Sequence, residues 1–219
     1  MKLAMITGAN RGIGLELTRQ LLGRRVEVIA ACRASSPELD ASGAEPITGV
    51  DVANDDSVAK LAAAVGDRSI DLLVNNAGIL TRESLDDLDF DRIRQQFEIN
   101  SLGPLRVTKA LLANLSSGSL VAIVTSLMGS MTDNGSGGRY GYRMSKAAIN
   151  AAGVSLSHDL RERGIGVLLL HPGMVATEMT ERRGVPVEQA ASGLLERIDA
   201  FTAEQSGTFW HADGRPLPW

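Results

Sequence analysis

Apolar residues in this chain form short unbroken runs that alternate with longer stretches of helical periodicity. The runs predict strands at 3–7, 26–31, 46–50, 70–76, 120–126 and 165–173, and they are compatible with an edge strand at 206–214. The periodic stretches predict helices at 12–23, 56–66, 90–115, 142–164 and 187–200. We expect Gly103-Pro104 to bend the third helix and Gly164 to cap the end of the fourth.

The order of these elements predicts the fold class. Strands that are apolar throughout, instead of alternating between apolar and polar positions, are typical of a parallel sheet covered on both faces. We therefore predict a single α/β domain over residues 1–219, a Rossmann-like doubly wound parallel sheet with helices on both faces. The turn-rich stretch 33–45 leaves room for one helical turn at most.

Composition narrows the classes of function. The 219 residues are 44% apolar and carry a formal charge of −4, so nothing in the charge balance favours nucleic acid or an anionic membrane as a partner. The single cysteine, Cys32, cannot form an internal disulfide, and the four aspartates within 86–91 lack the spacing of a metal-binding loop. We predict no metal site. Since no apolar run has the length of a signal peptide core or a membrane span, we predict a cytoplasmic protein.

The stretch TGANRGIG at 7–14 follows the first strand and opens the first helix. Gly8, Gly12 and Gly14 would permit a tight turn, a close approach of backbone to a phosphate, and close packing of helix on strand. The helix N-terminus would add free N–H groups and a positive dipole end. A bare structural turn would also explain three glycines, but the position between strand and helix favours a dinucleotide site.

Two arginines indicate which dinucleotide would bind. NAD-dependent enzymes of this layout usually place a carboxylate about 20 residues past the glycines to bind the adenosine ribose. Here Cys32 and Arg33 follow the second strand, and Arg11 lies in the glycine loop itself. Guanidinium groups suit the 2′-phosphate of NADP, so we predict NADP(H) in preference to NAD(H). The alternative is that Arg33 is an ordinary surface arginine.

A candidate general acid lies in RYGYRMSK at 139–146, which contains both tyrosines of the chain. Tyr142 and Lys146 are four residues apart and would share one helical face, whereas Tyr140 has Met144 at that spacing. An ammonium beside a phenol lowers the phenol pKa and makes it a usable acid for a carbonyl oxygen. On residue types alone, a surface helix explains the same pattern. His171, before Pro-Gly, is a weaker candidate base because the tyrosine–lysine pair already fills that role.

Taken together and in order, TGANRGIG, Asp51, NNAG at 75–78, Asn100, Ser126, YRMSK and HPGMVAT resemble the short-chain dehydrogenase/reductase family over nearly the whole chain. The stretch between Ser126 and Tyr142 and the ending GRPLPW are most similar to a subgroup that includes sniffer-type carbonyl reductases and bacterial C-factor-like proteins. The resemblance implies an NADP-dependent oxidoreductase that acts on a small carbonyl or alcohol substrate.

The resemblance also implies a role for individual residues. Tyr142 would be the general acid/base, Lys146 would tune it and hold the nicotinamide ribose, Ser126 would bind the substrate oxygen, and Asn100 would bind a relay water. Asp51 and Val52 would contact adenine, and Thr177 would bind the carboxamide. The full set of cofactor contacts would be Gly8, Asn10, Arg11, Gly12, Ile13, Gly14, Arg33, Asp51, Val52, Asn75, Ala77, Gly78, Tyr142, Lys146, Pro172, Gly173, Val175 and Thr177.

Two departures from the family pattern bear on the substrate. Ser126 and Tyr142 are unusually far apart, so the Gly-rich loop between them must fold outward. The segment after Thr177 is short where many relatives carry a helical lid, which predicts either an open, weakly discriminating pocket or a pocket completed by a neighbouring subunit. By analogy with relatives, the helices predicted at 90–115 and 142–163 could form a homodimer or homotetramer interface. The alternative function is that of a nucleotide-binding signalling protein of C-factor type with little turnover.

Overall fold

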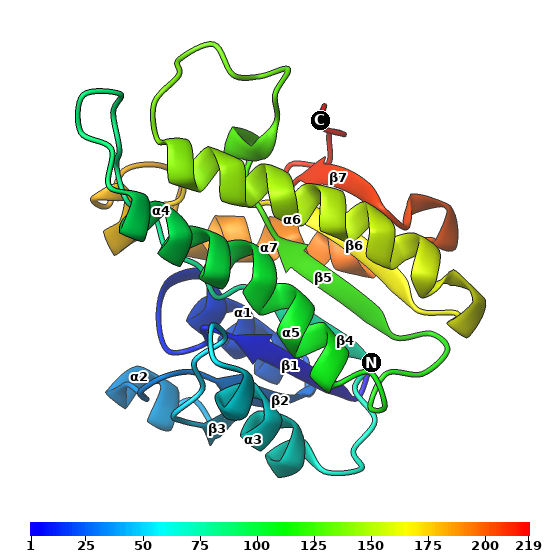
Figure 1. Cartoon of the computed structure of the whole chain (residues 1–219). Coiled ribbons are helices and arrows are strands. Elements are labelled where there is room, and N and C mark those ends of the chain that lie inside the picture. Colours follow the sequence, from blue (N-terminus) through cyan, green and yellow to red (C-terminus); the bar gives the residue numbers. More distant parts are fainter.

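The computed structural model describes all 219 residues and contains one parallel sheet of seven strands (Figure 1). The strands lie in the order β3-β2-β1-β4-β5-β6-β7, so the predicted doubly wound α/β fold is confirmed. Their bounds are β1 Leu3–Thr7, β2 Glu27–Ala31, β3 Glu45–Ile47, β4 Leu72–Asn75, β5 Leu120–Val124, β6 Gly166–His171 and β7 Thr208–His211. The last of these is the predicted edge strand, and it runs parallel to β6.

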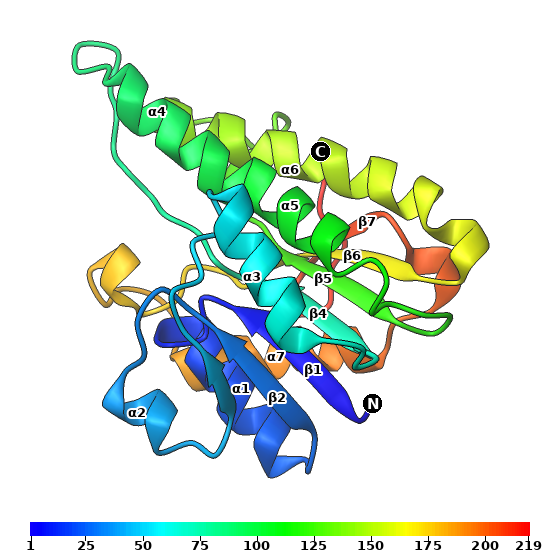
Figure 2. The ribbon, with the colours of Figure 1, turned by 60° about the horizontal axis from the view of Figure 1, so that its bottom comes forward.

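Helices cover both faces of the sheet (Figure 2). One face carries α1 and α7, which also pack on each other, and the opposite face carries α3, α5 and α6. Between β2 and β3 there is only the single turn α2, as the sequence predicts. The helix bounds are α1 Gly12–Gly23, α2 Pro37–Asp40, α3 Asp55–Val65, α4 Phe90–Phe97, α5 Gly103–Ala110, α6 Tyr140–Asp159 and α7 Val187–Asp199.

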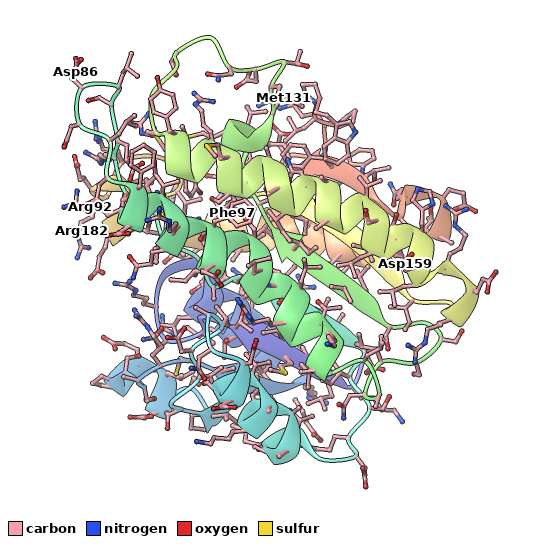
Figure 3. The ribbon with its side chains drawn as sticks, in the orientation of Figure 1. Asp86, Arg92, Phe97, Met131, Asp159 and Arg182 are labelled. Carbon is pink, nitrogen blue, oxygen red and sulfur yellow. The ribbon has the colours of Figure 1, made fainter.

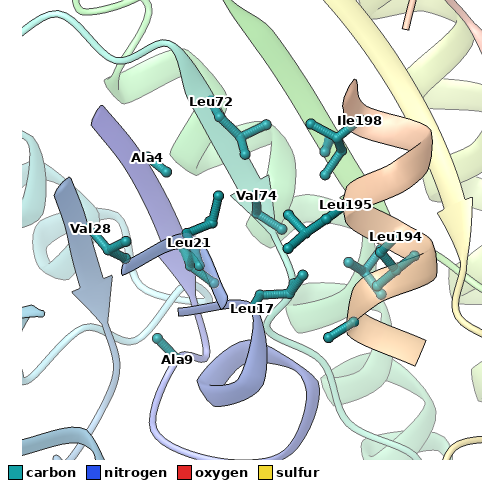
Figure 4. Close-up of a cluster of buried hydrophobic side chains, with 14 of the residues drawn as sticks. Ala4, Ala9, Leu17, Leu21, Val28, Leu72, Val74, Leu194, Leu195 and Ile198 are labelled. Atoms are coloured by element: carbon teal, nitrogen blue, oxygen red, sulfur yellow. The ribbon is translucent and has the colours of Figure 1, made fainter. Parts of the chain in front are cut away.

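The strands are apolar throughout because the sheet separates two cores of similar size, with 23 and 20 buried residues. Along β1, Ala4 and Ile6 belong to the core beneath α1 and α7, whereas Leu3 and Met5 belong to the core beneath α3 and α5. Figure 4 shows Leu17 and Leu21 of α1 and the leucines of α7 gathered around β1 and β4. Burial on both faces is what removes the alternation of polar residues.

The stretch predicted as one helix over 90–115 is interrupted. α4 passes into a π-helical turn at Glu98–Leu102 and then into α5, which ends at Ala110. Pro104 has no N–H to donate to the preceding turn, which explains why the wider turn falls just before it. Gly103 is needed at the same point because a Cβ there would lie 2.9 Å from Cγ2 of Val52.

The strand order reverses direction between β1 and β4. The chain passes from β1 outward through β2 to β3, then returns to add β4, β5, β6 and β7 on the other side. In sheets of this kind, ligands bind beyond the carboxyl ends of the strands at that reversal. The glycine loop follows β1, NNAG follows β4, Ser126 follows β5, and Pro172 follows β6, so the predicted site residues meet at one edge.

The close approach of the loop after β5 to α6 gives a testable prediction. A Cβ at Gly129 would lie 2.6 Å from the carbonyl carbon of Lys146 and 2.8 Å from its oxygen, whereas Gly135 in the same loop has nothing within 4 Å. We expect Gly129→Ala to lower the free energy of unfolding by about 1–3 kcal/mol, because backbone must move to admit the methyl group. Urea unfolding should show Gly135→Ala within about 0.5 kcal/mol of wild type. Equal stability of the two variants would contradict this packing.

Candidate active site

The glycine loop after β1 forms a cradle that fits a phosphate group. Gly8 and Gly12 adopt φ of +67° and +53°, and a Cβ on Gly14 would lie 2.3 Å from the carbonyl oxygen of Gly8. The first turn of α1 has neither a side-chain cap nor an acidic residue, so its N–H groups and positive dipole end are free to meet an anion. These features match a dinucleotide pyrophosphate.

Thr7 and Asn76 hold this loop in place, and sequence reasoning gave neither of them a role. The Thr7 hydroxyl accepts hydrogen bonds from the N–H groups of Asn76 and Ala77, both at 3.1 Å. Asn76 Nδ2 donates to the carbonyls of Thr7 and Gly8 at 3.0 and 3.2 Å. The feature of the sequence that could have predicted this role is the presence of polar residues at the ends of two neighbouring strands. Asn75 instead is 2% exposed and donates to Thr108 of α5, so its amide points away from the glycine loop.

The adenosine end of the predicted cofactor site lies beside the turn after β2. Asn10 Nδ2 donates to the carbonyl of Ala34 at 2.9 Å, and Ser36 Oγ donates to the carbonyl of Asn10 at 2.8 Å. These bonds fix the glycine loop against the segment that carries Arg33. The Arg33 side chain is exposed and takes part in no ion pair, whereas Arg11 forms an ion pair with Glu178. Ile13 packs against the α1–α7 core, and Asp51 Oδ1 accepts from Ala53 N at 2.9 Å.

Ser126, Tyr142 and Lys146 come together at the end of β5. Lys146 is 5% exposed, its Nζ donates to the carbonyl of Val124 at 2.9 Å, and it lies 5.7 Å from the centre of the Tyr142 ring. α6 begins at Tyr140, two residues earlier than predicted, but the four-residue spacing still brings tyrosine and lysine onto one face. Ser126 caps the short 3-10 turn that follows it by accepting from Met128 N at 3.2 Å.

Burial controls the protonation of this pair. It lowers the pKa of Lys146 from 10.5 to about 8, and it raises the pKa of Tyr142 above its ordinary value. The nearby Ser126 hydroxyl acts on the Tyr142 pKa in the opposite, lowering sense. The sequence led us to expect that the ammonium would lower the tyrosine pKa. In this structure, desolvation of the phenol instead raises that pKa.

Asn100 lies in the π-helical turn between α4 and α5. Its Oδ1 accepts from Ile79 N at 2.8 Å, and its Nδ2 donates to the carbonyl of Ile79 at 2.9 Å and to Ser145 Oγ at 3.0 Å. Gly78 makes room for this arrangement, since a Cβ there would lie 3.1 Å from Asn100 Oδ1 and 3.8 Å from Lys146 Nζ. The amide therefore joins the segment after β4 to the helix that carries Tyr142 and Lys146.

The remaining predicted contacts follow β6. Val175 is buried, and Thr177 faces the glycine loop, because a Cβ on Gly12 would lie 3.4 Å from Thr177 Cγ2. Pro172 is buried, and Gly173 is close to His211 of β7, whose Nε2 would be 3.4 Å from a Cβ on Gly173. His171 packs edge-on against His211 at 5.0 Å, and burial, followed by the charge of His211, lowers its pKa to about 3. A histidine that stays neutral in this way is poorly suited to act as a base.

The short segment after Thr177 folds back over the glycine loop. A bridge pairs Val175 with Val185, and ion pairs connect Glu178 to Arg11 and Glu181 to Arg82, the latter at 2.6 Å. The segment therefore touches both the glycine loop and the chain after β4, although it contains no lid helix. No group of three or more His, Cys, Asp or Glu side chains is arranged to hold a metal ion. No helix is both long enough and apolar enough to cross a membrane.

Comparison with known proteins adds to this geometry. A family model described as short chain dehydrogenase matches residues 2–186. The 1-hydroxy-2-glutathionyl-2-methyl-3-butene dehydrogenase of Rhodococcus sp. (strain AD45) is 45% identical over the full length of both chains. The C-signal protein of Myxococcus xanthus is 46% identical over 154 residues, which cover 68% of this chain and 93% of that protein.

Solved structures agree with the sequence comparison. The NADPH-bound carbonyl reductase from chicken fatty liver has a TM-score of 0.92 at 28% identity. The carbonyl reductase Sniffer of Drosophila melanogaster also has a TM-score of 0.92, at 29% identity. Each similarity covers the whole of both chains. The resemblance read from the motifs, including the sniffer and C-factor subgroup, is confirmed.

The buried ammonium of Lys146 gives a stability prediction. Burial lowers the pKa of Lys146 from 10.5 to about 8, so its charged form is destabilising in the folded protein. Below about pH 8 the group is charged in both states, and the folded protein bears the whole of this cost. Between about pH 8 and 10.5, Lys146 is still protonated in the unfolded chain but is losing its proton in the folded protein. The free energy of unfolding of wild type therefore rises with pH over this range. We expect Lys146→Met to be more stable than wild type at pH 7 by about 1–2 kcal/mol, after loss of one hydrogen bond.

Urea unfolding at pH 7 and 9.5 measures this difference, with Lys109→Met on the exposed side of α5 as the matched control. The advantage of Lys146→Met should shrink at pH 9.5, while Lys109→Met should show no such trend. An advantage that is the same at both pH values would contradict the desolvation argument.

Proposed function

The chain belongs to the short-chain dehydrogenase family, and on that premise we propose that it is an NADP-dependent oxidoreductase that interconverts a carbonyl and an alcohol with Tyr142 as general acid/base. The observation that carries the proposal is the convergence of Ser126, Tyr142 and buried Lys146 beside the glycine loop. A protein that only recognised a nucleotide would have no need for this set.

In the proposed reduction, NADPH held at the glycine loop would supply the hydride to the carbonyl carbon. Ser126 orients the substrate oxygen through its hydroxyl, and Tyr142 donates its phenolic proton to that oxygen as negative charge develops on it. Lys146 stabilises the phenolate that remains, because it is a buried cation within 5.7 Å of the ring. Asn100 acts as a positioning residue that ties the segment after β4 to α6. Oxidation of the alcohol uses the same groups in reverse.

The proposed cofactor contacts fall into three groups along the edge of the sheet. The glycine loop and the α1 N-terminus would bind the pyrophosphate, Arg33 and Arg11 the 2′-phosphate, and Pro172, Gly173 and Thr177 the nicotinamide. Arg33 is available for this role because it has no ion-pair partner, whereas Arg11 would have to leave Glu178. The NADPH-bound chicken carbonyl reductase, similar over the full chain, supports NADP(H) as the cofactor of this proposal.

The relatives suggest two extensions of this proposal. The Rhodococcus dehydrogenase, 45% identical over the full chain, is named for a glutathionyl alcohol, so we include glutathione conjugates among the substrates to be tested. The 46% identity to the Myxococcus C-signal keeps a signalling role as the second candidate function. Binding of NADPH without turnover of any carbonyl would favour the second candidate.

We further propose a homodimer or homotetramer of one domain that resides in the cytoplasm. α4 and α6 pack side by side on the same face (Figure 1), and Phe90, Phe97 and Met144 are exposed on them. These apolar side chains support an interface formed by the two helices. Light scattering on the purified protein determines the oligomer size.

The two tyrosines test the mechanism directly. We expect Tyr142→Phe to lower kcat by about a thousandfold, within the usual range for loss of a general acid, while NADPH binding is kept. Tyr140→Phe, two residues away on the same helix, should change kcat less than about twofold. Loss of absorbance at the nicotinamide band reports turnover. Full activity in Tyr142→Phe would exclude the mechanism.

The arginines test the cofactor preference. We expect Arg33→Ala to raise the KM for NADPH about tenfold and to leave the KM for NADH unchanged, since a charge-assisted hydrogen bond to the phosphate contributes about 1.5–3 kcal/mol. Arg19→Ala, further along α1, is the control. If Arg33→Ala changes both KM values equally, Arg33 does not bind the 2′-phosphate.

A further inference from the structure

A polar pocket lies between the chain after β4 and the loop that leads into α6. It has a volume of about 320 Å³, its walls are residues 82–84 and 136–139, and no apolar side chain lines it. The N–H of Arg139 donates to the carbonyl of Glu83 at 2.7 Å, which joins one wall to the other. Both walls project from the end of the molecule where Figure 3 labels Asp86 and Met131.

The residues that line this pocket include more arginines than carboxylates, although the chain as a whole has a net charge of −4. Arg82 pairs with Glu181, which Arg183 also contacts. Arg143 donates to Ser136 Oγ in the wall at 2.9 Å, but it meets no carboxylate. The guanidinium of Arg139 forms neither a hydrogen bond nor an ion pair, and it lies at the uncapped N-terminus of the twenty-residue helix α6. Unpaired guanidinium groups beside a positive helix end favour a bound anion.

Glu83, the carboxylate among the residues that line the pocket, does not take the place of such an anion. Glu83 is 4% exposed, and its Oε1 accepts hydrogen bonds from the Thr81 hydroxyl and from Gln96 Nε2. Its Oε2 is buried without a partner, so the group is directed into the protein and not into the pocket. The positive charge of Arg139 therefore remains available to a solute.

The pocket lies on the same two segments of chain as the proposed active site. Arg139 precedes Tyr142 by three residues, and the other wall begins four residues after Gly78. Between them, Ile79 N donates to Asn100 Oδ1 and Thr81 N donates to Gln96 Oε1 at 3.0 Å, so hydrogen bonds fix residues 79–83 along the path of the chain from Gly78 to the pocket. A substrate held at Tyr142 could extend a substituent along that path.

We propose that this pocket binds a carboxylate carried by the substrate on a flexible arm, with Arg139 as the main contact and Arg82 as the second. The planar guanidinium of Arg139 has two parallel N–H donors that match the two carboxylate oxygens. The inference rests on the proposed reaction at Tyr142 and adds a substrate class to it: carbonyls or alcohols that bear an acidic, peptide-sized tail. Small neutral carbonyls would bind without this contact.

The test compares two ketones with the same reacting group. S-phenacylglutathione carries carboxylates, and 2-(phenacylthio)ethanol does not. We expect Arg139→Gln to raise the KM for the glutathione conjugate about tenfold, the size of one charge-assisted contact, and to leave the KM for the neutral ketone within about twofold. Added salt should raise the KM of wild type for the conjugate only. Arg161→Gln, which makes the same charge change beyond the other end of α6, is the matched control and should match wild type with both ketones.

Calorimetry with S-methylglutathione separates failure of the pocket from failure of the reaction. We expect wild type to bind this probe and Arg139→Gln to bind it about tenfold more weakly. Binding of the probe without turnover of either ketone would contradict the proposed reaction and leave the pocket standing. The pocket proposal is overturned if Arg139→Gln leaves both the KM for the conjugate and the probe affinity unchanged, or raises the KM of both ketones equally.

Discussion

The candidate site depends on a buried cation. Lys146 reaches the end of β5 and is held there by one hydrogen bond to the carbonyl of Val124, with 5% of the residue exposed. Two glycines make that position available: Gly129 lets the loop after β5 touch the backbone of Lys146, and Gly78 leaves space beside its Nζ. A side chain at Gly129 would collide with the backbone of α6, and one at Gly78 would crowd Asn100 Oδ1 at 3.1 Å.

Burial has opposite effects on the two titratable members of the site, and the difference matters for the chemistry. Removing water disfavours the charged form of each group, which lowers the pKa of Lys146 and raises that of Tyr142. Proton donation to a developing alkoxide is helped when the ammonium is close enough to stabilise the phenolate left behind. The geometry supplies that proximity, since lysine and tyrosine share one face of α6 and Lys146 Nζ lies 5.7 Å from the centre of the phenol ring.

The charged side chains at the edge of the candidate site differ in whether they form ion pairs. Glu178 and Glu181 each engage an arginine from another segment, and these ion pairs hold the short segment after Thr177 across the glycine loop. Arg33 and Arg139 have no such partner, and they lie at opposite ends of the candidate site, one beside the turn after β2 and one at the start of α6. Under the proposals above, Arg33 would meet a phosphate of the cofactor and Arg139 a carboxylate of the substrate.

The sequence by itself determined the layer architecture and most of the site. Continuous apolar strands could only be buried on both faces, and glycines between strand and helix predicted the loop at the edge of the sheet, as did Tyr142 and Lys146 at helical spacing. Tertiary structure decided the rest. The π-helical turn that carries Asn100, the anchoring of the glycine loop by Thr7 and Asn76, and the pocket between residues 82–84 and 136–139 all depend on contacts between distant segments. The rise in the Tyr142 pKa was not predicted for the same reason. Desolvation depends on the residues that pack around a group, and the spacing of residues in the sequence does not reveal them.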